Sequence, residues 1–313
     1  MKPDQTLAWM HDGTRKLLAD VAALPDEALA LPTALPGWTR RYLLSHVAAN
    51  ADALRNLVHW ARTGEERRMY SSPEQRDADI AKGSQLPAAE LRARLESSAR
   101  ALAADLDTLP DQAWDAKVST AQGLTRSASE IPWMRAREVY IHAIDLAAGT
   151  AWADLPAEFL TELLDDVTAR RSSKGGGPAL AIAATDAGHT WKVAGAGAPL
   201  PVSAPLADLA AYLTGRPPEL AAAPALPAWL LSPGGRPPPV SPMSALAGLI
   251  AKTAIVSGPP APTKASHGDA PCTPMSALSA RFAKAAGCLG GGGHLADRQV
   301  AGHPAQAAVG GDL

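Results

Sequence analysis

Four segments with helical spacing of apolar residues dominate the first half of the chain, and they limit the folds that it can adopt. They span about residues 7–24, 39–64, 87–109 and 131–148. Each ends at a proline or a glycine, which are residues that stop helices. Thr39 can cap the second segment, and the sequence Ser127-Ala-Ser-Glu130 offers a capping box before the fourth. Four helices joined in this way predict a four-helix bundle over residues 1–150.

The pattern changes in the next part of the chain, which we expect to form a small α+β domain over residues 151–230. The pattern predicts helices at 156–171 and 204–213 and short strands at 179–184 and 190–193. The protein is therefore expected to be mainly α with a small α+β domain. After Trp229 the chain has no tyrosine, no further tryptophan and no glutamate, and it is dense in Pro, Gly and Ala. This composition predicts a disordered tail over residues 231–313.

Charge and cysteine content exclude several classes of function. The net charge is −2, and no basic field is present to bind nucleic acid. The N-terminus lacks an apolar signal core, and the apolar runs are too short to cross a membrane, so we expect a cytoplasmic protein. The two cysteines, Cys272 and Cys288, both lie in the predicted tail. Thiol chemistry would therefore need a small-molecule thiol, and a metal would need His and carboxylate ligands.

Glu138 and His142 lie one helical turn apart in an apolar segment, and His46 lies in another. Alone, the pair on the fourth segment is most simply a surface or semi-buried pair, and His46 is most simply a core histidine bonded to a backbone carbonyl. The apolar neighbours instead predict burial, which requires a partner or a cation. If the two helices pack together, the three side chains form a catalytic type of metal site with an open position. Asn50 and Asp145 could then orient the imidazoles, or could face solvent.

The same residues belong to motifs that are similar to those of a known family. They are Leu-Pro-Gly-Trp-Thr-Arg at 35–40, His46, Met-Tyr at 69–70, Arg-Asp-Ala at 76–78 and Trp-Met-Arg-x-Arg-Glu-Val-Tyr-x-His-Ala-x-Asp-Leu at 133–146. The chain resembles the mycothiol-dependent maleylpyruvate isomerases from about Leu7 to Trp229. The resemblance implies a DinB-like bundle that holds a divalent metal, typically zinc, on His46, Glu138 and His142. It also implies a catalytic arginine, which the sequence Thr-Gly-Arg places at Arg216.

The reaction implied by the resemblance is the cis-to-trans isomerisation of maleylpyruvate, a dicarboxylate, to fumarylpyruvate in gentisate breakdown, with mycothiol as cofactor. In the mechanism that we infer, the metal lowers the pKa of the thiol, and the thiolate adds to the double bond. Rotation and elimination then give the trans product, while Arg216 binds a carboxylate or stabilises the enolate. Two alternatives remain: a metal-dependent mycothiol S-transferase acting on another electrophile, and a noncatalytic zinc-binding regulatory module. No apolar stripe in the sequence requires the chain to form an oligomer.

Overall fold

The computed structural model describes residues 3–217, 220 and 223–228. The predicted tail at 231–313 lies outside the described residues. Within the described part of the chain, no helix combines the length and the apolar character that a membrane span needs.

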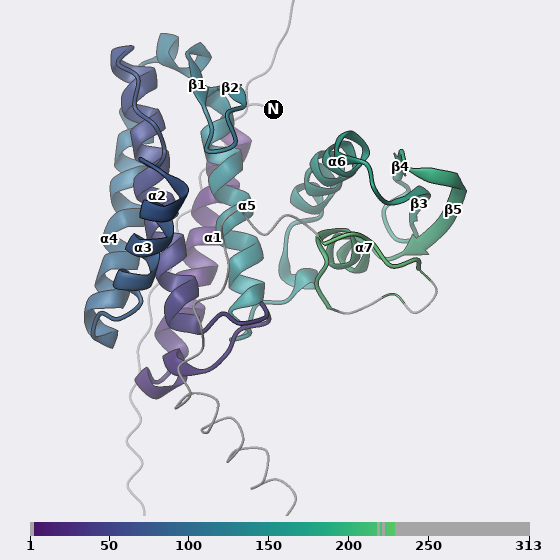
Figure 1. Ribbon diagram of the computed structural model, residues 1–313, viewed down its shortest axis with the longest axis horizontal. Coiled ribbons are helices and arrows are strands. Elements are labelled where there is room, and N and C mark those ends of the chain that lie inside the picture. The colour runs from purple at the N-terminus through teal and green to yellow at the C-terminus, as the bar shows by residue number, and fades with distance from the viewer. Residues whose placement is uncertain (1–2, 218–219, 221–222, 229–313) are drawn as a thin grey trace, which may run out of the picture. The chain divides into compact units, whose positions relative to one another are not determined.

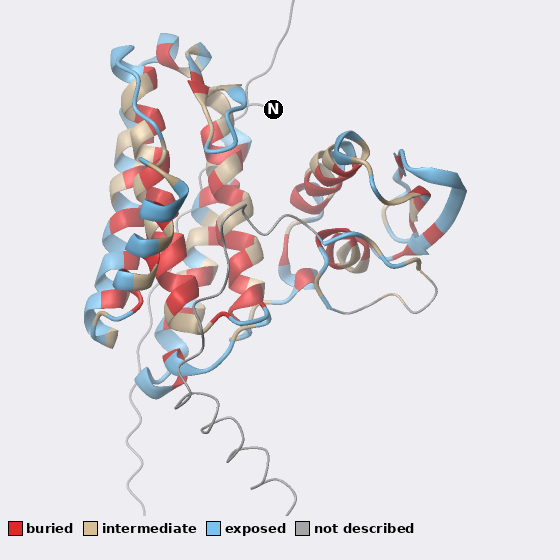
Figure 2. Cartoon of the chain, viewed as in Figure 1, coloured by how far each residue is buried: buried red, intermediate tan, exposed pale blue. Residues whose placement is uncertain are grey.

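The predicted helical bundle is confirmed. Its long helices are α1 (Pro3–Ala23), α2 (Arg40–Thr63), α4 (Ala88–Asp107) and α5 (Ile131–Asp145). They lie side by side in Figure 1, with α1 packed on α5 and α2 packed on both α4 and α5. The Thr39 hydroxyl accepts a hydrogen bond from the Tyr42 N–H, and Gly64, with φ of 76°, ends α2 in the left-handed region. Figure 2 shows that the buried residues of these helices face one another.

One further helix, α3 (Pro73–Gly83), lies outside the four predicted helical segments. Its start has the usual signals: the Ser72 hydroxyl accepts from the Gln75 N–H, and Pro73 occupies the first turn. The apolar period is missing, because Ile80 is the one large apolar side chain that α3 buries. Packing against α2 therefore stabilises a helix that periodicity alone does not indicate.

The shorter elements complete the first part of the chain. Short 3₁₀ segments are η1 (Asp26–Ala30), η2 (Asp111–Asp115), η3 (Ala128–Glu130) and η4 (Trp152–Asp154). A hairpin of β1 (Lys117–Ser119) and β2 (Thr125–Ser127), also not predicted, precedes α5.

The predicted α+β domain is confirmed, with one more strand than expected. It contains α6 (Ala157–Lys174), β3 (Pro178–Ala184), β4 (Thr190–Val193), β5 (Ala196–Ala204) and α7 (Leu206–Thr214). The sheet order is β4-β3-β5, with β4 antiparallel and β5 parallel to β3. Pro199 and Pro201 argue against a strand in the sequence, but β5 lies at a sheet edge, where proline is tolerated.

An aromatic cluster lies between α1, α5 and α6. Phe159 of α6 is fully buried, and its ring centroid lies 5.8 Å from that of Trp9, 5.5 Å from that of Trp133 and 4.4 Å from that of Tyr140. These rings belong to one hydrophobic cluster that also includes Leu209 and Leu213 of α7. Helix α7 is thereby packed on the core that contains α5.

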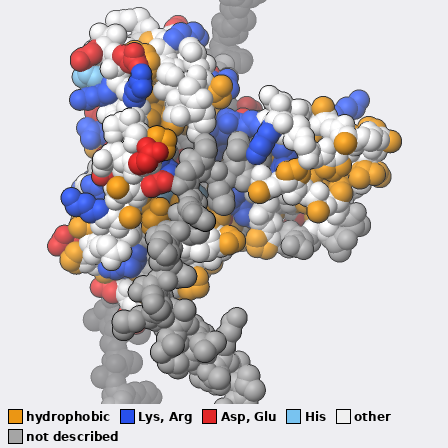
Figure 3. Space-filling view, viewed as in Figure 1, with side chains coloured by type: hydrophobic (Ala, Val, Ile, Leu, Met, Phe, Trp, Pro, Cys, Tyr) orange, Lys and Arg blue, Asp and Glu red, His pale blue; other side chains and the backbone are white. Residues whose placement is uncertain are grey.

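The charged surface of the bundle is mixed. Figure 3 shows acidic and basic side chains next to one another on the bundle, and Arg55 pairs with Asp105 at 2.6 Å while Arg94 pairs with Asp52 at 3.2 Å. The face in this view does not carry the single-sign field that nucleic-acid binding requires.

Candidate metal centre

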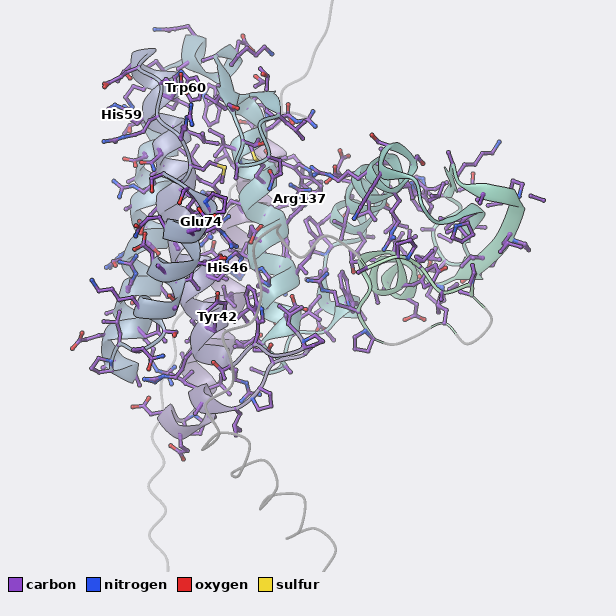
Figure 4. The ribbon with its side chains drawn as sticks, in the orientation of Figure 1. Tyr42, His46, His59, Trp60, Glu74 and Arg137 are labelled. Atoms are coloured by element: carbon purple, nitrogen blue, oxygen red, sulfur yellow. The ribbon has the colours of Figure 1, made fainter. Side chains whose placement is uncertain are left out.

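The structure brings His46, Glu138 and His142 together. His46 projects from α2, as labelled in Figure 4, and the other two residues lie one turn apart on α5. Glu138 Oε2 lies 3.2 Å from His46 Nε2 and 3.3 Å from His142 Nε2, and the three ligand atoms fall within 4.8 Å of one another. Ligands at about 2.0–2.1 Å from a tetrahedral zinc ion are about 3.3 Å apart. The nitrogen-to-oxygen distances therefore fit a shared divalent cation.

The second nitrogen of His142 is held by a buried carboxylate. His142 Nδ1 lies 3.0 Å from Asp145 Oδ2, and Asp145 is 0% exposed. A hydrogen bond from Nδ1 fixes a proton there, so Nε2 is the nitrogen that faces the centre and would ligate a metal after losing its own proton. Asp145 thus has the orienting position that the sequence allowed for it.

The second nitrogen of His46 has a different partner. His46 Nδ1 lies 3.3 Å from an Arg76 guanidinium nitrogen, which can only donate. In this arrangement Nδ1 accepts, so the imidazole donates from Nε2 to Glu138. A neutral imidazole that ligates a metal through Nε2 carries its proton on Nδ1 instead. The Arg76 contact and metal ligation by His46 therefore exclude each other, and ligation requires Arg76 to turn away.

Burial and neighbouring charges shift the pKa values of His46, Glu138 and His142 in different directions. Burial lowers the pKa of His46, and the Glu138 carboxylate only partly opposes this effect. Burial also acts against protonation of His142, but hydrogen bonds to Asp145 and Glu138 outweigh it and raise the pKa to about 9. Burial would raise the pKa of Glu138, yet the two imidazoles hold it well below its ordinary value. The carboxylate is thus ionised at neutral pH, as a metal ligand must be.

The segment before α2 shapes one side of the centre. Gly37 has φ of 79°, which favours glycine, and it lets the chain turn so that Trp38 is buried. The Trp38 ring lies edge-on to His46 at 5.3 Å and stacks on His142 at 6.4 Å. Arg40 donates to the carbonyls of Leu146 and Ala147 at 2.9 and 2.8 Å, just past the end of α5. The segment therefore fixes the start of α2 against the end of α5, where His142 lies.

Arg216 reaches the centre through Asp145. Gly215, with φ of 71°, ends α7 in the left-handed region, and the Arg216 N–H donates back to the Ala211 carbonyl. The guanidinium donates to both oxygens of Asp145, at 3.0 Å from Nε and 2.9 Å from Nη2. Asp145 thus accepts hydrogen bonds from the candidate ligand His142 and from the arginine of the α+β domain.

A cavity of about 670 Å³ opens beside the three candidate ligands. It is lined by all three and by Arg216, and by the motif residues Trp38, Met69, Tyr70 and Arg76. Arg137, labelled on α5 in Figure 4, and Arg170 of α6 also line it, and the two cations share the carboxylate of Asp166. Sequence reasoning missed both arginines. Arg137 immediately precedes Glu138 in the long motif and could have been found, whereas Arg170 carries no signal in the sequence.

Asn50 also lines the cavity, but not in the role considered for it. Its side-chain oxygen accepts from Arg135 at 2.8 Å, and among the described residues it forms no hydrogen bond to His46.

Comparison with known proteins identifies relatives of both domains. Residues 10–147 match the mycothiol maleylpyruvate isomerase N-terminal domain, and residues 154–261 match the C-terminal domain of the same family. The chain in a crystal structure of the mycothiol-dependent maleylpyruvate isomerase has 36% sequence identity to this chain and a TM-score of 0.70. The match covers 73% of this chain and 98% of that chain. A histidine-to-alanine mutant of that isomerase is 37% identical, with a TM-score of 0.67 over 69% and 90% of the two chains. No match was found among curated protein sequences.

Proposed function

Because the chain belongs to the mycothiol maleylpyruvate isomerase family, we propose that it is a metal- and mycothiol-dependent isomerase that converts maleylpyruvate to fumarylpyruvate. The observation that carries this proposal is the joint geometry of the centre. Three candidate ligands share one cavity with Arg216, and Asp145 joins His142 to that arginine. The open cavity supports an enzyme over a noncatalytic zinc module, which would need a closed shell.

His46, Glu138 and His142 would hold the metal, with zinc favoured by two imidazoles and one carboxylate. When bound, the metal would lower the pKa of the mycothiol thiol, so that thiolate can add reversibly to the activated double bond, which rotates as a single bond before elimination. The two cysteines of the chain, Cys272 and Cys288, are not among the described residues, so no described residue around the centre supplies a thiol. This agrees with a mechanism in which mycothiol supplies the nucleophile.

Arg216 would bind a substrate carboxylate or the negative charge that addition creates. Its Nε and one terminal nitrogen are held by Asp145, and the other terminal nitrogen donates to the Thr214 carbonyl at 2.8 Å. The plane of the guanidinium is therefore fixed before substrate arrives, so little entropy is lost on binding.

Two further cations favour a substrate with two negative groups. Arg137 and Arg170 share one carboxylate, Asp166, so these three residues together carry one excess positive charge. The Arg137 guanidinium also lies over the Trp133 ring at 5.7 Å, which holds it in place. Charge-assisted pairing with a carboxylate is the interaction that such a pair of arginines supplies.

The deciding experiment is a spectrophotometric assay of maleylpyruvate with zinc-loaded protein, with and without mycothiol. We expect turnover only with the thiol, and loss of both turnover and bound zinc in His142→Ala. His11→Ala, which changes an exposed histidine of α1, is the matched control and should retain both. Turnover without thiol would refute the mechanism. Mycothiol consumption with other electrophiles but not with maleylpyruvate would assign the protein to the S-transferases instead.

A further inference from the structure

Arg135 is a cation buried in the bundle, and the Glu138 and Asp52 carboxylates act on it only at a distance. It lies on α5, is 1% exposed, and donates from Nη1 to the Val47 carbonyl and to Asn50 Oδ1, both at 2.8 Å. Among the described residues no carboxylate forms an ion pair with it, and its Nη2 has no hydrogen-bond partner. Burial lowers the pKa of Arg135 to about 10, although the Glu138 carboxylate acts in the opposite direction.

The contact with Arg135 determines which way the Asn50 amide points. A guanidinium can only donate, so Asn50 must present its oxygen to Arg135 and turn its NH₂ group away. Asn50 is 6% exposed and lies on α2 one turn after His46. It lines the cavity, and within the described part of the chain its Nδ2 has no acceptor. The amide donors are therefore left for the cavity beside the metal centre.

An amide is not the residue that would best compensate a buried cation. An aspartate in the same space would neutralise Arg135 and keep the hydrogen bond. What the amide adds is a donor on its other side. The pair is thus better explained by a ligand for that donor than by the needs of Arg135 alone.

We propose that Arg135 orients Asn50 so that its Nδ2 donates to a carboxylate or carbonyl oxygen of an anionic substrate held beside the metal centre. Asn50 is then a substrate-binding residue, and Arg135 is a positioning residue that acts through it. The inference rests on the proposed function, since it assumes a dicarboxylate in this cavity.

Binding of maleate to the zinc-loaded full chain, measured by calorimetry without thiol, tests the proposal. Asn50→Asp keeps the shape and the Arg135 contact but replaces the donor by an acceptor. We expect maleate to bind roughly 10- to 100-fold more weakly, while zinc affinity and the thermal midpoint are retained. Gln122→Glu adds the same charge at an exposed position of the cavity rim and should weaken binding less than threefold. Wild-type maleate affinity in Asn50→Asp, or an equal loss in both variants, would overturn the proposal.

Arg135→Met tests the positioning role. With Asn50 intact but free to rotate, we expect a smaller loss of maleate affinity and a rise in KM for maleylpyruvate that exceeds the change in kcat. If this variant does not fold, Asn50→Asp alone decides. Absence of maleate binding in the wild type would also overturn the inference. Maleate binding without isomerase activity would instead refute only the proposed function, so the two failures are distinguishable.

Discussion

The link between the candidate metal centre and Arg216 can be tested by Asp145→Asn. Asp145 Oδ2 accepts from both His142 and Arg216, and Oδ1 accepts a second bond from Arg216. An amide has only one acceptor atom. If its oxygen replaces Oδ2, the NH₂ group faces the Arg216 Nε–H, and if it is flipped, the NH₂ group faces two donors. No rotamer therefore satisfies all three bonds, and the better one sacrifices a contact to Arg216.

The size of the effect follows from burial. Asp145 is fully buried and Arg216 is 10% exposed, so the carboxylate is the charge that compensates two buried cations. Removing one partner of such a pair costs about 3–5 kcal/mol. Loss of the carboxylate that orients a histidine ligand typically costs about 10- to 100-fold in metal affinity. We expect both effects in Asp145→Asn.

Urea denaturation of the metal-free protein measures the first effect, and competition with a chromophoric zinc chelator measures the second. Asp20→Asn is the control, because Asp20 is half-buried and accepts from the Thr150 N–H at 3.2 Å, outside the centre. It should change stability by less than about 1 kcal/mol and leave zinc affinity unchanged. If Asp145→Asn behaves like this control, the carboxylate does not couple His142 to Arg216.

Three further predictions concern the same region. The folded-state pKa of His142 is raised from 6.5 to about 9, so protonated His142 stabilises the fold fully below pH 6.5 and this effect is lost toward pH 9. The free energy of unfolding of the metal-free protein should therefore fall by up to about 3 kcal/mol over that range. His142→Gln should not show this fall. Arg137→Gln should raise KM for maleylpyruvate about tenfold with little change in kcat, and an unchanged KM would remove Arg137 from the binding wall. A Cβ on Gly83 would lie 2.3 Å from Ser45 Oγ, so Gly83→Ala should lower the free energy of unfolding by about 1–3 kcal/mol. Adding Ser45→Ala, which removes the clashing oxygen, should restore most of that free energy.

The helices that carry the candidate metal centre could be predicted because their signals are local. Apolar periodicity and a cap at Thr39 predicted α2. A glutamate one turn before a histidine in an apolar run predicted the pair on α5. The approach of His46 to that pair depends on how α2 packs on α5, which the sequence pattern only made plausible. The resemblance to a family, not the spacing, singled out Arg216.

The elements that were missed obtain their stability from contacts that are distant in sequence. Helix α3 buries few apolar side chains and packs against α2, and β5 contains prolines that only an edge position tolerates. The pairing of Arg137 with Asp166 joins α5 to α6 and has no short-range pattern. Arg135 is a plainer case, because an arginine in a helix predicts a solvated side chain. Its burial becomes clear only in the structure, where its guanidinium donates hydrogen bonds to the Val47 carbonyl and to Asn50.

The two domains supply different charged residues to the candidate centre, and this predicts different roles for them. The bundle supplies all three candidate ligands and Asp145, whereas Arg216 comes from the end of α7. Without the α+β domain, Asp145 would keep its hydrogen bond to His142 but would lose both bonds from Arg216. Under the proposed function, metal affinity would depend on the first contact, and recognition of substrate anions would depend on the second. Zinc binding is therefore expected to be a property that the bundle largely retains by itself, while isomerase activity requires the α7 terminus to meet Asp145.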